Sequence, residues 1–458
     1  MRVPGSIFRE YDIRGVADRD LTNEVVHALG LALATMLPNA PSRRLVLARD
    51  CRVSSERLHA ALVRGLTEGG AHVIDAGVGP TPMLYFAAHT LDVDGGIMIT
   101  GSHNPGDENG FKMMRGRSSF FGADIQALRA RVMSGELPRS AGGRVESVDV
   151  RDDYVSALVR DIERPTSAMS VVLDAGNGAG GPLGLRALRA IGLEPDALYC
   201  EMDGLFPNHH PDPTVPKNLA ALVARVKERG ARVGLAYDGD ADRLGAVDPS
   251  GEIVWGDQLM ILFSRAVLEK NPGAAILGEV KCSQTLYDDI AKHGGRPIMW
   301  KTGHSLIKTK MKEEQALLAG EMSGHLFFAD RYFGYDDAIY ASLRLVELLA
   351  KTGKTMRELL ADVPRTVSTP EIRVDCPDET KFDVVARVIE TFRARGNAVI
   401  DIDGARVAFG GGAWGLVRAS NTGPVLVMRF EARDDAELVR IRTDVEEAVA
   451  SARAARRA

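Results

Sequence analysis

The segment 233–243, VGLAYDGDADR, joins a short apolar run to three aspartates. A continuous apolar run of this length, followed by polar residues, is typical of a strand that is buried on both faces. Asp238, Asp240 and Asp242 begin where the run ends, and ligands in open α/β sheets bind beyond the carboxyl ends of the strands. The segment therefore predicts a parallel sheet with a polar loop at the end of a buried strand.

Two further segments repeat this arrangement of an apolar run followed by an unusual polar loop. Residues 96–105 read GIMITGSHNP, and residues 317–325 read LLAGEMSGH. Ligand sites often lie where several such loops converge between domains. We therefore expect the three loops to meet in one cleft.

The surrounding sequence alternates apolar runs with amphipathic segments. Leu45–Ala48 reads as a strand, and Ser54 is placed to cap a helix that stops at Gly69-Gly70. Ala71–Asp75 then reads as a strand again. Repeated units of this kind predict mostly parallel sheets that are covered by helices.

The chain has 458 residues, which is enough for several domains of about 100–200 residues each. The first predicted domain ends in the polar stretch Gly135–Gly143, the second opens with the strand Ser170–Asp174, and the last ends in a helix over Asp434–Ala450. The predicted domains are residues 1–150, 151–255, 256–367 and 368–458.

The composition is that of an ordinary globular protein, with 45% hydrophobic and 26% charged residues. A net charge of −5 gives no overall attraction to nucleic acid or to an anionic membrane. The four cysteines form no C-x-x-C pair, which argues against a zinc ribbon or a disulfide framework. The N-terminus lacks the apolar core of a signal peptide, and no run approaches the roughly 18 apolar residues of a membrane span. We expect a cytoplasmic protein.

The three aspartates of 238–243 favour a metal site. In an extended chain the outer two would lie about 13 Å apart, so only a bent loop can gather them, and Gly239 permits such a bend. Clustered carboxylates repel one another unless a cation neutralises them, and oxygen ligands favour Mg²⁺ or Ca²⁺. An EF-hand is excluded because Arg243 and Pro249 stand where it needs Gly and Glu. A solvated acidic turn is the structural alternative.

Ser102 needs either an activating base or a phosphate to carry. His103 is its neighbour, but neighbours in a chain rarely point at each other, and no G-x-S-x-G elbow surrounds the serine. A hydrolase triad is therefore disfavoured, whereas a structural turn at residues 104–107 stays open. Lys112, downstream of this loop, can hold a phosphate's charge or transfer a proton, or can be a surface lysine.

Two other loops suit sugar and phosphate groups. Glu321 and Ser323 can bind the hydroxyls of a sugar, although a capping or core role explains them equally. Residues 417–424, VRASNTGP, supply an arginine fork and several donors for a phosphate, although a β-turn would favour the same residues. Arg14, Lys281 and His304 are further polar candidates for the cleft.

Two nucleotide-binding motifs are only partly matched. Residues 176–181 contain G-x-G-x-x-G. A dinucleotide site also needs an acidic residue at the end of the next strand to bind the ribose, and no clear candidate for it is present. Residues 353–355, GKT, resemble the end of a P-loop, but Leu348 stands where its first glycine belongs. Neither a nicotinamide site nor a P-loop is expected.

Taken together, the motifs resemble those of the α-D-phosphohexomutases, and most closely the bacterial phosphomannomutase/phosphoglucomutase branch. They occur in that family's order over essentially the whole chain: YDIRG (11–15), TGSHNPGDENGFK (100–112), DGDADR (238–243), GEMSGH (320–325) and RASNTGP (418–424). The resemblance implies three similar α/β domains with mixed sheets and a smaller C-terminal α+β domain, arranged around a central cleft.

The resemblance also implies roles for individual residues. Ser102 would carry the phosphoryl group, and it would bind Mg²⁺ together with Asp238, Asp240 and Asp242. Lys112 and His304 would be candidates for proton transfer, and Arg14 and Arg243 would complete the catalytic group. The implied substrate-binding residues are Tyr11, His103, Lys281, Glu321, Ser323, His325, Arg418, Ser420, Asn421 and Thr422.

The implied reaction interconverts hexose 1-phosphates and 6-phosphates through a 1,6-bisphosphate, with glucose 1,6-bisphosphate as activator. Met322 and the segment 206–213 are similar to the mannose/glucose branch, whereas phosphoglucosamine mutases usually carry glutamine at the position of Met322. Ala241 is a departure, because Gly is commoner there, and a positive φ would strain it slightly. A monomer that acts on small sugar phosphates, without nucleic acid or membrane, is expected.

Three competing hypotheses remain at this point. A phosphoglucosamine mutase would share the chemistry and differ in the sugar. A phosphatase would let water take the phosphoryl group from Ser102, which a mutase must prevent by excluding water. A sugar-phosphate sensor would bind without turnover and would leave Ser102 and the aspartate loop unexplained.

Overall fold

The computed structural model describes residues 3–36, 43–421 and 423–454, and they divide into two compact units. The first unit contains Met1–Leu259 and Ser323–Leu359, and the second contains Met260–Met322 and Leu360–Ala458. Strands and helices alternate along most of the chain, as the sequence pattern predicts.

The first sheet of the first unit has strands β1 (Ile13–Val16), β2 (Arg44–Arg49), β3 (His72–Val78), β4 (Gly95–Ile99), β5 (Glu108–Arg115), β6 (Ser118–Ser119) and β7 (Arg144–Ser147). Their order is β1-β5-β4-β2-β3-β7, and β6 pairs with β5. β2 is parallel to β3 and β4, whereas β5 is antiparallel to β1 and β4, so the sheet is mixed. It is accompanied by η1 (Gly5–Ile7), α1 (Asn23–Met36), α2 (Ser55–Glu68), α3 (Thr81–Thr90) and α4 (Ala123–Ser134).

The second sheet has strands β8 (Val171–Asp174), β9 (Asp196–Leu198), β10 (Val233–Tyr237), β11 (Leu244–Val247) and β12 (Ile253–Val254), in the order β12-β11-β10-β8-β9. β8 is parallel to β9 and β10, and β11 is antiparallel to β10. The other elements of the first unit are α5 (Arg151–Val159), α6 (Gly181–Ala190), η2 (Pro216–Leu219), α7 (Ala220–Arg229), β16 (Leu326–Phe328), α11 (Ala338–Thr352) and α12 (Met356–Leu359).

Helix α8 (Gly256–Lys270) contains the boundary between the units. The second unit continues with β13 (Ala275–Glu279), α9 (Gln284–Lys292), β14 (Arg296–Trp300), α10 (His304–Glu314) and β15 (Leu318–Gly320). β13 is parallel to both β14 and β15, so this part again has the α/β pattern.

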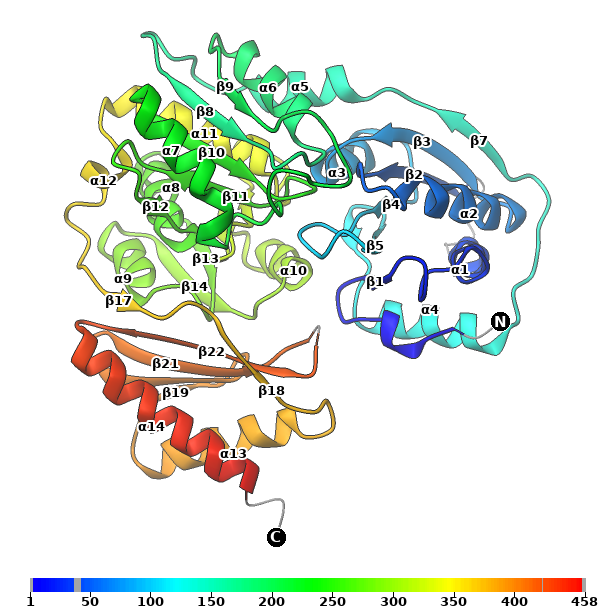
Figure 1. Ribbon diagram of the computed structural model, residues 1–458. Helices are drawn as coiled ribbons and strands as arrows, with labels where there is room; N and C mark the ends of the chain where they lie inside the picture. The colour runs from blue at the N-terminus through cyan, green and yellow to red at the C-terminus, as the bar shows by residue number, and fades with distance from the viewer. Residues whose placement is uncertain (1–2, 37–42, 422, 455–458) are drawn as a thin grey trace. The chain divides into compact units, whose positions relative to one another are not determined.

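The C-terminal part is a sheet of β17 (Val367–Ser368), β18 (Ile372–Asp375), β19 (Val399–Ile400), β20 (Ala405–Gly410), β21 (Ala413–Ala419) and β22 (Val425–Ala432). The order is β17-β22-β21-β20-β19, with β18 also paired to β22, and every pairing is antiparallel. Helices α13 (Lys381–Ala394) and α14 (Asp435–Ala454) pack beside each other and against β21 (Figure 1).

This architecture confirms the predicted fold class of three α/β parts and a C-terminal α+β part. The runs that contain Gly96–Ile99, Val233–Tyr237 and Leu317–Ala319 do form strands that end in the three polar loops, within a residue or two at each end. The four domain ranges stay a prediction.

One local expectation was wrong. Helix α2 begins after Ser54 as predicted, but the Ser54 side chain makes no capping hydrogen bond. Its Oγ instead accepts a hydrogen bond from Nδ2 of Asn109 at 2.9 Å. Ser54 also has helical backbone angles, φ −74° and ψ −17°, instead of the extended ones that a capping residue usually adopts.

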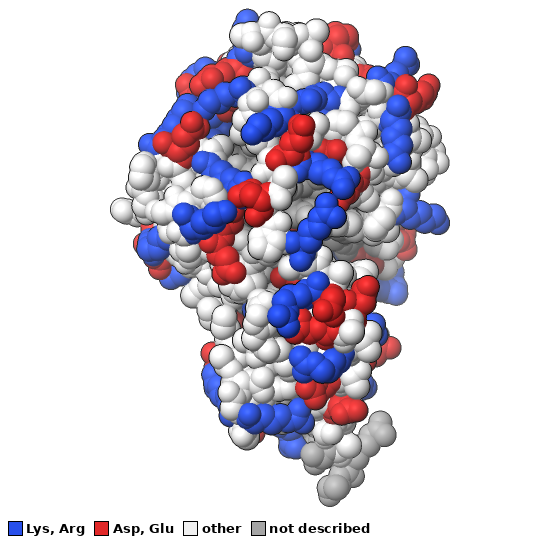
Figure 2. Space-filling model, turned by 90° about the vertical axis from the view of Figure 1, so that its left-hand side faces the viewer, with Lys and Arg blue, Asp and Glu red and all other residues white. Residues whose placement is uncertain are grey.

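None of the helices in the described part of the chain combines the length and apolarity that crossing a bilayer requires. On the face drawn in Figure 2, Lys and Arg side chains are interspersed with Asp and Glu. That face carries no extended patch of a single sign of charge.

Candidate active site

The loop after β10 brings its three aspartates together as predicted. Asp238, Asp240 and Asp242 are fully buried, and they offer ligand oxygens that all lie within 4.8 Å of one another. Oδ1 of Asp238 accepts hydrogen bonds from the backbone N–H groups of Asp242 at 3.0 Å and Arg243 at 3.1 Å, so the loop curls around this carboxylate. Ala241 has φ +56°, a left-handed conformation that is slightly strained for alanine, as the sequence comparison anticipated.

Lys112 of β5 reaches this cluster from the first sheet. Its Nζ donates to Oδ2 of Asp240 at 2.6 Å and to Oδ2 of Asp242 at 2.5 Å. Burial alone would lower the pKa of Lys112, but the carboxylates outweigh it and raise that pKa above its ordinary value. The ammonium form is therefore favoured, and the alternative of a surface lysine is excluded because the side chain is buried.

Ser102 lies near the start of the loop between β4 and β5. It is buried, has φ +47°, and its Oγ donates to Oδ2 of Asp238 at 2.7 Å. A Cβ on Gly239 would lie 2.4 Å from the carbonyl oxygen of Ser102, so a glycine there lets the two loops approach. The serine and the three aspartates thus form one buried group.

The side chains of Ser102 and His103 were expected to point away from each other, and this expectation was wrong. Nδ1 of His103 lies 3.1 Å from Oγ of Ser102. With φ +47°, Ser102 is not in the extended conformation in which successive side chains point to opposite sides. Because the hydroxyl proton of Ser102 is directed to Asp238, Nδ1 of His103 is the donor in this contact. Burial, reinforced by Arg243 and Arg14, places the pKa of His103 well below its usual value. This arrangement is not that of a triad base.

The aspartate cluster suits a divalent cation. Oδ1 of Asp240 and Oδ1 of Asp242 are buried and accept no hydrogen bond from the residues that the structure describes. Burial, together with the charges of Asp242 and Asp240, raises the pKa of Asp238 well above the usual range, as expected where negative charge lacks full compensation. Hard oxygen donors of this kind match Mg²⁺ better than zinc or copper.

Two predicted cationic residues flank the group. Arg14 of β1 donates to Asp12 at 2.7 Å and to Oδ1 of Asn104, in the serine loop, at 2.7 Å. Arg243 donates through Nε to Nε2 of His325 at 2.9 Å. Nδ1 of His325 lies 3.0 Å from Oδ2 of Asp336, so Asp336, His325 and Arg243 form a chain of contacts.

The second unit contains other predicted residues. Lys281 is buried, with its Nζ 3.2 Å from Oε2 of Glu371, and Oε1 of Glu321 accepts from the backbone N–H of Gly303 at 2.7 Å. That hydrogen bond fixes the loop just before His304, which begins α10. Burial alone would lower the pKa of Lys281, but nearby carboxylates, Glu279 first, raise it, and the residue stays charged.

The predicted phosphate loop follows β21. Nε of Arg418 donates to Oδ2 of Asp403 at 3.0 Å, and the same oxygen accepts from the backbone N–H of Thr302 at 3.0 Å. Nζ of Lys381 stabilises the loop by donating to the carbonyl oxygens of Ser420 at 2.5 Å and Gly423 at 3.1 Å. Thr422 lies outside the described residues.

The predicted residues therefore fall into two sets. The first unit holds Tyr11, Arg14, Ser102, His103, Lys112, Asp238, Asp240, Asp242, Arg243, Ser323 and His325. The second unit holds Lys281, His304, Glu321, Arg418, Ser420 and Asn421. Contacts within the first unit join the serine, lysine and aspartate loops.

Several residues that support these loops were missed by the sequence reasoning. Thr81 donates to Oδ2 of Asp240 at 2.5 Å, and Glu279 is fully buried and accepts from backbone or side-chain donors of Lys281, Thr302 and Met322. Arg52 contacts the serine loop. Nothing in their local sequence separates them from ordinary polar residues, because their partners are distant in the chain.

Family models match the chain in four consecutive parts. They describe phosphoglucomutase/phosphomannomutase α/β/α domain I over residues 5–137, domain II over residues 152–251, domain III over residues 255–367, and the C-terminal domain over residues 371–448. The four parts span most of the chain.

Individual relatives are similar over nearly the full length. A phosphomannomutase/phosphoglucomutase of Pseudomonas putida is 47% identical over 440 residues, covering 96% of this chain and 94% of the relative. A phosphoglucomutase of Neisseria meningitidis serogroup A is 43% identical, covering 97% of each chain. The crystal structure of a phosphoglucomutase/phosphomannomutase family protein from Burkholderia thailandensis matches with a TM-score of 0.91 and 42% identity, covering 99% of this chain and 98% of that one.

Proposed function

The chain belongs to the phosphoglucomutase/phosphomannomutase family, and from this premise we propose that it interconverts the 1-phosphates and 6-phosphates of glucose and mannose. The observation that carries the proposal is the buried hydroxyl of Ser102, 2.7 Å from a cluster of three carboxylates. A serine placed in this way is suited to carry a phosphoryl group beside a cation.

The reaction begins with a phosphoryl group on Ser102. The free hydroxyl of a hexose 1-phosphate loses its proton and attacks the phosphorus, a new O–P bond forms, the bond from Oγ of Ser102 to phosphorus breaks, and Oγ takes up a proton. The hexose 1,6-bisphosphate then turns end for end and returns its other phosphoryl group to Ser102. Such transfers depend mainly on positioning and on stabilisation of the phosphoryl charge.

Asp238, Asp240 and Asp242 would hold Mg²⁺, with an oxygen at Ser102 as a further ligand. When bound, the ion supplies positive charge at the transferring phosphoryl group. Lys112 adds a second cation, and its raised pKa supports a role in holding charge. Arg14, Arg243 and His304 are also assigned catalytic roles, with His304 as the candidate for proton transfer.

The remaining predicted residues are assigned to substrate. Glu321 and Ser323 would bind sugar hydroxyls, since a carboxylate accepts from them and a hydroxyl both donates and accepts. Arg418 and the loop from Ser420 would bind the phosphate that is not reacting, because an arginine fork matches phosphate oxygens. Tyr11, His103, Lys281 and His325 would complete the binding surface.

The test is phosphorus NMR of the purified protein with Mg²⁺ and a trace of glucose 1,6-bisphosphate. Glucose 1-phosphate, mannose 1-phosphate and glucosamine 1-phosphate are supplied in separate samples. We expect the first two to become 6-phosphates. Conversion of glucosamine 1-phosphate alone would keep the mechanism and change the sugar. Release of inorganic phosphate at the rate of sugar turnover, or no change, would overturn the mutase proposal.

A further inference from the structure

Arg52 is a buried cation close to Ser102. It lies in the short connection between β2 and α2, and its side chain has a relative exposure of 0%. Taking a guanidinium group out of water is costly unless its donors are satisfied by hydrogen bonds. Its partners therefore indicate what it does.

The guanidinium group donates to four backbone carbonyl groups of a single loop. Nη2 donates to the carbonyl oxygens of Ser102 at 2.7 Å and Asn104 at 2.6 Å. Nη1 donates to those of Pro105 at 2.6 Å and Glu108 at 2.9 Å. One planar fork thus gathers the carbonyl groups of the loop over residues 102–108 around one centre.

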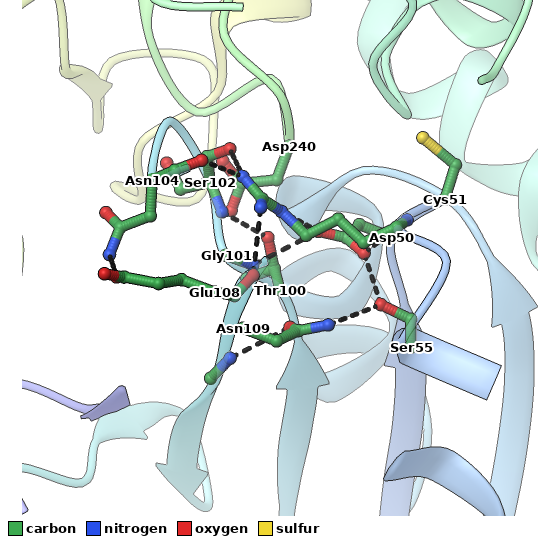
Figure 3. Close-up of polar contacts among 12 residues, drawn as sticks. Asp50, Cys51, Ser55, Thr100, Gly101, Ser102, Asn104, Glu108, Asn109 and Asp240 are labelled. Atoms are coloured by element: carbon green, nitrogen blue, oxygen red, sulfur yellow. Dashed lines mark hydrogen bonds and ion pairs between the residues drawn. The ribbon is translucent and has the colours of Figure 1, made fainter. Parts of the chain in front are cut away.

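Arg52 is itself held in place from several sides. Its Nε lies 3.4 Å from Oδ2 of Asp50, and its Cζ lies 5.2 Å from the centre of the Phe206 ring. Asp50 also accepts from the backbone N–H of Gly101 at 3.2 Å and from Oγ of Ser55 at 2.5 Å (Figure 3). The loop around Ser102 is therefore tied to the start of α2.

The loop needs such an anchor. Ser102 has φ +47°, which an L-residue adopts only when its surroundings enforce it. In a planar trans peptide the C=O and N–H groups point in opposite directions, so the carbonyl groups of Ser102, Pro105 and Glu108 that converge on Arg52 turn the N–H groups of the residues after them away from it. Asn104 is followed by proline, which has no N–H. The guanidinium group thereby keeps the carbonyl oxygens, which are the negative ends of the peptide dipoles, on one side of the loop.

We propose that Arg52 is a positioning residue for the phosphoryl-carrying serine, and that it acts by clamping the backbone of residues 102–108. This inference rests on the proposed mutase function and extends it to a residue that does not touch substrate. Lysine cannot replace arginine here, since a single ammonium nitrogen with three donors cannot reach four carbonyl groups at these distances.

The experiment compares Arg52→Lys with Arg57→Lys. Arg57 is the matched control because it also donates to backbone carbonyl groups, those of Leu21 and Ala17, but away from Ser102. For Arg52→Lys we expect kcat to fall on the order of 100-fold while KM for glucose 1-phosphate changes less than about threefold, since misplacement of a reacting group affects the chemical step. Arg57→Lys should keep both constants.

Hydrogen exchange of the folded proteins gives a readout that does not depend on turnover. The peptide covering residues 101–110 should exchange faster in Arg52→Lys than in the parent and in Arg57→Lys, because the loop loses its clamp. If the parent shows no mutase activity, the proposed function fails, and this exchange difference still decides whether Arg52 holds the loop.

Three results would overturn the inference: kcat within about threefold of the parent, an equal loss in both lysine variants, or a rise in KM alone. If Arg52→Lys does not fold, Phe206→Leu removes the ring beside the guanidinium group and leaves its charge. That variant should show the same faster exchange at residues 101–110 and a smaller fall in kcat. Unchanged exchange and kcat in Phe206→Leu would then count against the clamp.

Discussion

Oγ of Ser102 lies 2.7 Å from Oδ2 of Asp238, although 136 positions separate the two residues in the chain. The contact joins the loop after β4 to the loop after β10, and both strands are buried throughout. A group attached to Ser102 therefore sits beside the carboxylates that suit a divalent cation. Substitutions at Ser102 and at Asp240 test this juxtaposition of the proposed phosphoryl carrier and the proposed cation site.

Replacement of Ser102 by alanine should remove mutase activity by more than about 1000-fold, because the variant has no oxygen to carry the phosphoryl group. The fold should persist, which circular dichroism and thermal unfolding would check. Ser134→Ala, at an exposed serine of α4, is the control. Activity of Ser102→Ala within a few-fold of the parent would reject the phosphoserine mechanism.

Asp240→Asn should lower turnover by on the order of 100-fold and weaken its dependence on Mg²⁺, since one of the three carboxylates proposed as metal ligands is lost. Titration calorimetry with Mg²⁺ measures the binding directly. Asp149→Asn, at an exposed carboxylate paired with Arg151, should leave the titration as in the parent. An unchanged titration in Asp240→Asn would remove the aspartate loop from the metal site.

The loops themselves were predictable because their signals are local. An apolar run followed by D-x-D-x-D identifies a buried strand and a carboxylate cluster within eleven residues, 233–243. The bend of the aspartate loop was not predictable in detail, because it depends on the backbone N–H groups of Asp242 and Arg243, which donate to the carboxylate of Asp238. The sequence predicted strain at Ala241 only if its φ were positive, and the φ of +56° shows that it is.

The residues that support the loops, such as Arg52, were not predictable because their contacts are not local in the sequence. Arg52 stands just before a helix, where an exposed arginine would look the same in sequence. Its four carbonyl partners lie 50 to 56 positions away. Ser54 fails a local capping rule, because its backbone angles are already helical and its hydroxyl accepts from the distant Asn109. In both cases the partner of the side chain is far away in the sequence.

Arg418→Ala should raise KM for glucose 1-phosphate and mannose 1-phosphate by about tenfold or more and change kcat less, since the phosphate that we assign to Arg418 is not the one in transfer. Asp403→Asn should act in the same direction more weakly, because Asp403 orients the guanidinium group at 3.0 Å. Arg433→Ala, at an exposed arginine, is the control. If KM stays at the parent value in Arg418→Ala, the phosphate-site assignment is wrong.

His209 provides a test through stability and pH. Its Nε2 lies 3.0 Å and 3.1 Å from the two carboxylate oxygens of Asp174, and its Nδ1 lies 2.9 Å from the carbonyl oxygen of His210, so both ring nitrogens face acceptors. Burial alone would lower the pKa of His209, but the hydrogen bond and charge of Asp174 raise it above the ordinary value. The folded protein therefore binds this proton more tightly than the unfolded chain does.

This contribution to the free energy of unfolding is complete below the unfolded pKa of about 6.5 and is lost as the pH rises through the higher folded pKa. Between about pH 6 and about pH 9, the parent should therefore lose more stability than His209→Gln, as measured by urea unfolding. Asp174→Asn should flatten the same pH dependence, and the double variant should add nothing further because both changes remove one interaction. Parallel curves for the parent and His209→Gln would show that the His209–Asp174 pair contributes no pH-dependent stability.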